Sequence, residues 1–346
     1  MVRNCLFFTC FAVFTSLFGM FLMHLDINKR AYNHVPGECG VIPNLPGILS
    51  LATTTGGRLY MTVNSRENSS TTHLFTFYSD NRTAREIEIE KHLKQKETRN
   101  SLKPGPMSAT SDPENPTMFV FNERTRNVEV FETNEQSDTW KYQWTSRHGR
   151  YQRLTDLAAS TKNTIYFVTS SFLGDSFVFK LFERILPIPS GQVFFANKIA
   201  VKQLMFISTP TAIVYDELRK TIFVTSFTRN SIYAIRVKND YNVEKVTEHN
   251  IGCSPTSIWK DFDGSFVVTC QQVRFRYLLQ LLEVTQSSPT LVLRVVISVD
   301  KEKENFRTIT QLYSNDGATI SHATAAVRAG RSLLISEKEN ILNCHL

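Results

Sequence analysis

One short pattern of β-forming residues recurs six times along the chain. Each copy is a turn residue followed by an alternating or continuous hydrophobic run, at residues 57–63, 116–121, 163–169, 220–226, 264–270 and 330–336. Further runs at residues 231–237 and 277–284 follow two of these copies, and we expect them to be strands as well. Copies that lie roughly 45–65 residues apart are typical of propeller blades, although a pair of β-sandwiches would give a similar rhythm. The pattern therefore predicts an all-β fold, with a six-bladed β-propeller as the favoured architecture.

A hydrophobic segment without charged residues occupies residues 4–25. About 20 apolar residues are enough for a helix to cross the hydrocarbon core of a bilayer. The segment is long for a signal peptide and ends without a small-residue cleavage site, so we favour an uncleaved transmembrane helix over a cleaved signal peptide. The chain is thus divided into a membrane anchor at residues 4–25, a juxtamembrane linker at 26–35 and a propeller at 36–346.

Two features predict that the propeller lies on the lumenal or extracellular side of the membrane. Asn68 and Asn81 each begin an Asn-X-Ser/Thr glycosylation sequon. Cys39 and Cys344 lie near the two ends of the propeller, where a disulfide formed in an oxidising compartment could staple a closed fold.

The segment at residues 85–115 interrupts the rhythm of strands. It begins with a charged stretch, and prolines then recur at Pro104, Pro106, Pro113 and Pro116. Because proline has no N–H to donate to a strand ladder, we expect this segment to be a loop on the surface.

Charge and motifs exclude several classes of function. The net charge is +7, but the basic residues are scattered and form no stripe interleaved with aromatic residues, so we expect no nucleic-acid partner. The sequence lacks the CxxC, HExxH, GxSxG, Walker and GxGxxG motifs. Asp261 and Asp263 form a DxDG sequence that could suggest calcium, but the rest of an EF-type loop is missing. We interpret it as a structural turn.

The C-terminal region resembles the end of the paraoxonases, which are calcium-dependent lactonases and arylesterases with a six-bladed propeller. The resemblance rests on ITQLYSNDGATI at residues 309–320, TAAVRAGRSLLI at residues 324–335 and a cysteine at position 344. It extends from about Pro36 to the end and is clear again at residues 103–122 and 154–168. It implies a six-bladed propeller, a disulfide between Cys39 and Cys344, and a free cysteine at Cys270. From the residues alone, Cys253 and Cys270 are either free or paired.

The same resemblance implies which positions would carry the catalytic site, and most of them hold unsuitable residues. The catalytic histidine of the family's Asn-Pro-His-Gly-Ile-Ser segment corresponds to Gly105, and its supporting histidine corresponds to Glu123. The calcium-ligand positions correspond to Leu49, Ser50, Thr155, Asp156, Thr211, Pro255 and Thr256. Calcium takes about six to eight oxygen ligands, several of them carboxylates, and Asp156 alone cannot hold the ion. Without metal and histidine, no evident group polarises a lactone carbonyl or activates water.

We therefore expect a non-catalytic protein without a cofactor. Calcium would be expected as a cofactor only if the metal-binding residues lie at other positions. One membrane-anchored branch of paraoxonase-like proteins assists the folding, assembly and surface delivery of degenerin-type sodium channels, chiefly in the endoplasmic reticulum. Resemblance to this branch implies membrane lipid as a partner, membrane proteins such as sodium-channel subunits as clients, and a single-pass location in the endoplasmic reticulum or plasma membrane. The alternatives are a calcium-dependent lactonase or arylesterase with a divergent active site, and a secreted lipoprotein-associated binding protein.

Overall fold

Each of the six recurring runs forms the second strand of a small sheet. These second strands are β3 (Leu59–Asn64), β8 (Thr117–Asn122), β12 (Thr164–Thr169), β16 (Thr221–Ser226), β20 (Phe266–Gln271) and β24 (Ser332–Ser336). Every residue of β8, β16 and β20 is buried, because neighbouring sheets cover both faces of these strands. A strand buried on both faces needs a nearly continuous hydrophobic run, which is the pattern the sequence repeats.

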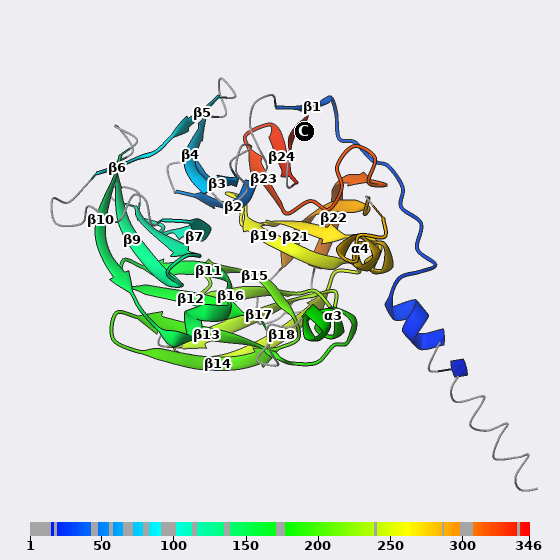
Figure 1. Ribbon diagram of the computed structural model, residues 1–346, viewed down its shortest axis with the longest axis horizontal. Helices are drawn as coiled ribbons and strands as arrows, with labels where there is room; N and C mark the ends of the chain where they lie inside the picture. The colour runs from blue at the N-terminus through cyan, green and yellow to red at the C-terminus, as the bar shows by residue number, and fades with distance from the viewer. Residues whose placement is uncertain are drawn as a thin grey trace, which may run out of the picture.

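The six sheets are the blades of a closed propeller in the computed structural model of the protein (Figure 1). The innermost strands surround a central channel, and each contacts the innermost strand of the next blade, from the first blade to the sixth and back to the first. They are β2 (Ile48–Thr53), β7 (Pro104–Ala109), β11 (Leu154–Thr161), β15 (Pro210–Asp216), β19 (Ser254–Lys260) and β23 (Ala325–Ala329). The predicted six-bladed propeller is confirmed, and a pair of β-sandwiches is excluded.

The structure describes residues 15–16, 19–42, 48–54, 58–64, 72–78, 83–90, 102–112, 116–134, 139–170, 177–238, 241–285, 287–297, 307–337 and 340–346. The third strands of the blades are β4 (Thr72–Tyr78), β9 (Asn127–Asn134), β13 (Gly191–Asn197), β17 (Ser231–Lys238), β21 (Thr290–Ile297) and β25 (Ile341–His345). The outer strands are β5 (Thr83–Glu86), β10 (Thr139–Ser146), β14 (Val201–Ile207), β18 (Asn242–Asn250), β22 (Arg307–Asn315) and β1 (Cys39–Val41). A short strand, β6 (Glu88–Glu90), pairs in parallel with β10. The described helices of the propeller are η1 (Gly149–Arg153), α3 (Phe177–Ile185) and α4 (Arg274–Leu281).

The sixth blade is built from both ends of the chain. β1 pairs antiparallel with β25, and the register places Cys39 opposite Cys344. The predicted disulfide between these two cysteines is present. A second disulfide joins Cys253 to Cys270 within the fifth blade, so the free cysteine inferred at position 270 is wrong. The hairpin of β19 and β20 makes this pairing possible, because it brings the residue before one strand close to the end of the other.

Two stretches fold differently from what their sequences predict. Residues 277–284, expected as a strand, lie largely in helix α4, whose leucine, glutamine and arginine residues favour a helix. Residues 104–109, expected in a surface loop, form the inner strand β7. The prolines are tolerated there because β7 pairs on one side only and its pairing with β8 is irregular between Pro104 and Met107.

The N-terminal segment runs along the propeller before it leaves the body of the molecule (Figure 1). Residues 19–24 are helical. The guanidinium of Arg274 on α4 donates to the main-chain carbonyl of His24 at 3.0 Å. In the expected linker at residues 26–35, His34 forms a β-bridge with Ser314. The expected linker is therefore attached to the fifth blade over part of its length.

The predicted anchor and glycosylation sites fall wholly or largely outside the described residues. Residues 4–14 and 17–18 of the anchor segment are outside them, as are Asn68 and Asn81. Among the residues that are described, no helix is both long and apolar enough to cross a membrane.

Candidate functional site

A ring of β-bulges surrounds one end of the central channel. In five blades the pairing of the first two strands is irregular near the start of the inner strand. The irregular stretches are 48–50, 104–107, 154–156, 210–213 and 255–257. A bulge leaves a residue unpaired and re-aims its side chain, and bulges are common next to active sites. Within these stretches lie Leu49, Gly105, Thr155, Thr211 and Thr256, so the structure brings together positions that the resemblance singled out.

At the position of the family's catalytic histidine, a neighbouring side chain fills the space. A Cβ added to Gly105 would lie 3.0 Å from Cγ and 3.1 Å from Oε1 of Glu123. Lys103 holds Glu123 in place, with 3.1 Å between Lys103 Nζ and Glu123 Oε2. A histidine at position 105 would therefore require Glu123 to move. Where the resemblance expects two histidines, the structure has a glycine beneath an ion pair.

A buried polar pair supports the turn that carries Glu123, and sequence reasoning missed it. Asn122 Nδ2 donates to Glu129 Oε1 at 2.6 Å, and Asn122 Oδ1 accepts from the main-chain N–H of Lys103 and Arg124 at 3.2 and 3.1 Å. Burial raises the pKa of Glu129, while the hydrogen bond from Asn122 acts in the opposite direction. The signal in the sequence was Glu129, which stands between two valines in β9.

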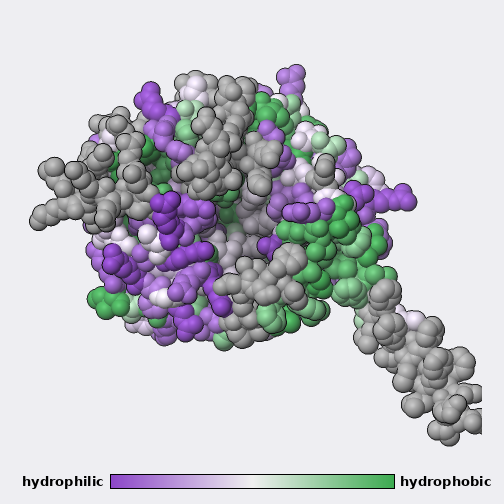
Figure 2. Space-filling view, viewed as in Figure 1, coloured by the Kyte–Doolittle hydropathy of each residue, from purple (hydrophilic) through white to green (hydrophobic). Residues whose placement is uncertain are grey.

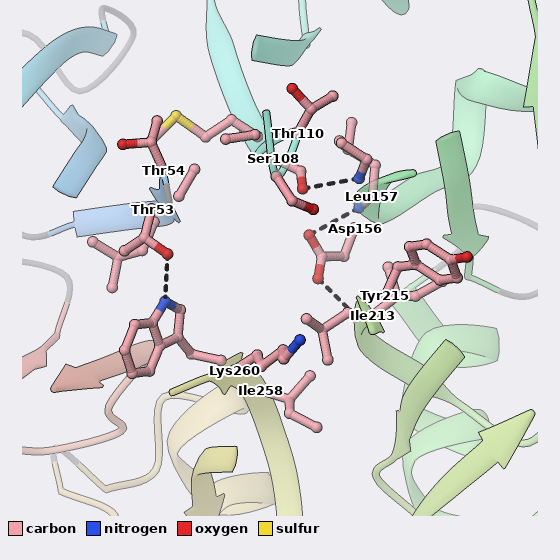
Figure 3. Close-up of a pocket in the computed structure, with 18 of the residues that line it drawn as sticks. Thr53, Thr54, Ser108, Thr110, Asp156, Leu157, Ile213, Tyr215, Ile258 and Lys260 are labelled. Carbon is pink, nitrogen blue, oxygen red and sulfur yellow. Dashed lines mark hydrogen bonds between the residues drawn. The ribbon is translucent and has the colours of Figure 1, made fainter. Parts of the chain in front are cut away.

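Asp156 is the one carboxylate among the calcium-ligand positions. Its Oδ1 accepts from the N–H of Leu157 at 2.9 Å, and its Oδ2 accepts from the N–H of Ile213 on β15 at 2.8 Å (Figure 3). Burial raises the pKa of Asp156 to about 7, although both hydrogen bonds act in the opposite direction. Asp156 therefore links the third blade to the fourth and exchanges its proton near neutral pH.

Next to Asp156 the channel opens into a cavity of about 300 Å³ (Figure 3). Inner strands of several blades form its wall, which includes Thr53, Thr54, Ser108, Thr110, Tyr215, Ile258 and Lys260. Lys260 already has a partner, since its Nζ lies 2.9 Å from Asp216 Oδ1. Thr53 Oγ1 accepts from Trp259 Nε1 at 3.3 Å. The cavity has the size for a small molecule, but these polar groups are already hydrogen-bonded within the protein.

The DxDG turn is held by hydrogen bonds and ion pairs. Asp263 Oδ1 accepts from the N–H of Ser265 at 2.9 Å, and its Oδ2 lies 2.7 Å from Arg294 Nη2. Asp261 Oδ2 lies 3.0 Å from Arg328 Nη1 on the sixth blade. The two carboxylates thus join the β19–β20 turn to neighbouring strands, in agreement with the structural interpretation.

The donors at the calcium-ligand positions do not fit calcium. The ion takes about six to eight oxygen ligands, and only Asp156 supplies a carboxylate here. Two of the positions carry side chains without oxygen, and three hydroxyls are hydrogen-bonded to main-chain groups, those of Ser50, Thr211 and Thr256. In the described parts of the chain, no three or more His, Cys, Asp or Glu side chains are grouped to hold a metal.

The closed six-bladed propeller and the disulfide between the two outer strands of its sixth blade agree with the resemblance to the paraoxonases. The sequence matches the arylesterase family over residues 10–346. The chain therefore belongs to the arylesterase family.

A sequence relative agrees with this assignment, and two solved structures agree with the fold. Mechanosensory abnormality protein 6 of Caenorhabditis elegans is 26% identical over 347 residues, which cover 94% of this chain and 90% of that protein. The structure of a luciferin-regenerating enzyme superposes with a TM-score of 0.53 at 8% identity, covering 90% of this chain and 95% of that one. A putative gluconolactonase gives 0.50 at 8% identity, covering 91% and 97%. At such low identity the two structures support the fold alone.

Proposed function

We propose that the chain is a membrane-anchored, non-catalytic member of the arylesterase family. Its role would be to assist the folding, assembly or surface delivery of membrane proteins such as degenerin/epithelial-type sodium channels. The observation that carries the proposal is the packing of Glu123 over Gly105. A general base must reach the water that it activates, and the carboxylate of Glu123 is engaged by Lys103 instead.

An apolar surface supports the membrane location. Phe179 and Phe182 on α3 are 47% and 53% exposed, and Met23 of the N-terminal helix is 70% exposed. The two elements adjoin, since His24 Nε2 lies 2.8 Å from the carbonyl oxygen of Ile185. Figure 2 shows hydrophobic residues gathered where α4 meets the N-terminal segment. Exposed apolar patches of this kind mark contacts with membranes or partners, and this one includes the C-terminal end of the predicted anchor.

The C. elegans relative supports the choice of client. Its name records a mechanosensory abnormality, and the branch that this chain resembles serves degenerin-type sodium channels. The lactonase alternative also has one observation in its favour. Asp156 keeps a carboxylate at a calcium-ligand position.

The deciding experiment measures a client with and without the chain. A degenerin-type channel subunit is expressed in cells that contain or lack the full-length protein, and its surface level is measured by surface biotinylation. We expect a severalfold higher surface level with the protein, and an equal effect from Asp156→Asn, because the role does not use hydrolysis. An unchanged surface level of the client with the wild-type protein would contradict the proposal. If the wild-type protein raises the surface level and the folded Asp156→Asn variant does not, the lactonase alternative would be favoured.

Membrane attachment is tested separately by alkaline carbonate extraction of cell membranes. A single-pass protein stays in the membrane pellet, whereas a peripheral protein is released. We expect the chain in the pellet at its full-length mass. Its appearance in detergent-free medium or supernatant would favour the secreted, lipoprotein-associated alternative.

A further inference from the structure

Every junction between neighbouring blades is bridged near the channel by a hydrogen bond between a side chain and the main chain. Three bridges use a main-chain N–H as donor: Met107 to Ser50 Oγ at 3.1 Å, Ala159 to Ser108 Oγ at 2.9 Å, and Ile213 to Asp156 Oδ2 at 2.8 Å. The other three use a threonine hydroxyl as donor: Thr211 to Pro255 O at 2.9 Å, Thr256 to Ala323 O at 3.3 Å, and Thr324 to Ile48 O at 3.0 Å. Followed around the channel, the six bonds pass through all six blades and return to the first.

The free edges of the inner strands explain why these bonds form. Each inner strand pairs within its sheet on one side only, so main-chain N–H and C=O groups on its other edge have no ladder partner. Met107 and Ile213 lie on such edges, where regular pairing resumes after an irregular stretch. A buried main-chain polar group without a partner costs free energy comparable to a lost hydrogen bond. The side chain of the preceding blade supplies the missing partner in both cases.

The residues that make the bridges share size, polarity and exposure. They are two serines, three threonines and one aspartate, all short enough to reach only the adjacent strand. All six are half-buried, as befits side chains that line a channel. Four of them stand at calcium-ligand positions of the family, namely Ser50, Asp156, Thr211 and Thr256.

We propose that this ring of hydrogen bonds fastens the six blades at the centre in place of a bound divalent cation, so that closure of the propeller does not depend on calcium. A cation draws oxygen ligands from several strands to one point. The ring instead joins the strands pairwise around the channel. The disulfide between Cys39 and Cys344 closes the outer side of the sixth blade, so the two closures use different chemistry. The inference goes beyond the proposed function, and it holds whichever protein is the client.

The test is hydrogen exchange of the full-length chain in detergent micelles, resolved to single amides by mass spectrometry. Ser108→Ala removes the acceptor of the Ala159 N–H, and one hydrogen bond corresponds to about a fivefold change in an opening equilibrium. We expect the Ala159 amide to exchange about fivefold faster. Smaller increases should appear at Met107 and Ile213, because an opened ring loosens the adjoining junctions.

Thr133→Val is the matched control. It removes a buried bond inside the second blade, from Thr133 Oγ1 to Pro116 O at 3.0 Å. The amides of Met107, Ala159 and Ile213, which we call the junction amides, should then exchange as in the wild type. Should Ser108→Ala fail to fold, Ser50→Ala makes the same test at Met107.

Chelation provides the second arm. Excess EGTA should change neither the melting temperature of the wild-type chain nor the exchange of its junction amides. A lower melting temperature or faster exchange in EGTA would overturn the proposal, because a cation would then hold the centre. An effect of Ser108→Ala confined to Ala159 would also overturn it, since the six bonds would be independent rather than a ring.

Discussion

Replacing Asp156 with asparagine should reverse the order of stability between variant and wild type as pH rises. The pKa of Asp156 is raised from 3.8 to about 7, chiefly by burial. The folded protein therefore keeps this proton up to about pH 7, whereas the unfolded chain releases it near pH 4. The folded state binds more protons in that interval, so this group makes stability fall as pH rises from 4 to 7. A shift of about three units corresponds to about 4 kcal/mol.

Asparagine has the same shape and stays neutral throughout. Its amide nitrogen replaces one oxygen, so one of the two N–H bonds from Leu157 and Ile213 is lost, at a cost of about 1 kcal/mol. The variant should thus be less stable than the wild type by about 1 kcal/mol at pH 3 and more stable by about 3 kcal/mol at pH 8. Plotted against pH, the free energies of unfolding of the two proteins should cross at about pH 4.5.

The assay is denaturant unfolding of both full-length proteins in micelles at several pH values, followed by tryptophan fluorescence. Lys260 and Asp261 line the same cavity, and their contributions cancel in the difference between the two proteins. A wild type that gains stability over the variant as pH rises would refute the reasoning. That result is expected of a carboxylate held ionised, as a calcium ligand would be.

Three further predictions concern other parts of the fold. Changing both Cys39 and Cys344 to serine should lower the free energy of unfolding, measured by denaturant titration, by up to about 5–6 kcal/mol. The chain-entropy model gives this value because the disulfide joins residues 305 positions apart. Arg274→Met should destabilise the fold by about 3 kcal/mol and expose the expected linker to protease, because the guanidinium is fully buried and bonds to His24. Burial lowers the pKa of His322 to about 4, so the stability that this histidine contributes above pH 6.5 is lost as pH falls. In thermal melts between pH 7 and pH 4, His322→Gln should reduce the loss of stability with falling pH by about 3 kcal/mol.

The sequence predicted the strands that neighbouring sheets bury on both faces. All six recurring runs became second strands, because burial on both faces demands the continuous hydrophobic pattern that repeats. The cysteines near the two ends also predicted how the last blade closes, since β1 and β25 pair where Cys39 meets Cys344.

Helices and bulges were harder to predict from local pattern. Residues 277–284 and the stretch FVFKLFERI of α3 are rich in leucine or phenylalanine, and short hydrophobic runs of this kind fit a strand or a helix equally well. The recurring prolines of residues 85–115 predict a loop where strand β7 forms, and a proline is acceptable on an inner edge that only the tertiary fold creates.

The candidate site was predictable only as a set of positions. The resemblance identified Gly105 and Asp156 by their neighbours in sequence. What these positions do depends on contacts between blades, such as the packing of Glu123 on Gly105 and the bond from Ile213 to Asp156. No local pattern encodes those contacts, because each joins segments that meet only when the ring closes.

The most direct test of a non-catalytic propeller is hydrolysis of lactones and aryl esters by the purified full-length chain, with excess calcium and again after EGTA. We expect no turnover above the detergent blank under either condition, and the same result for Asp156→Asn. Turnover that requires calcium and disappears in Asp156→Asn would contradict the account, because it would place a working metal site where the structure has hydrogen bonds.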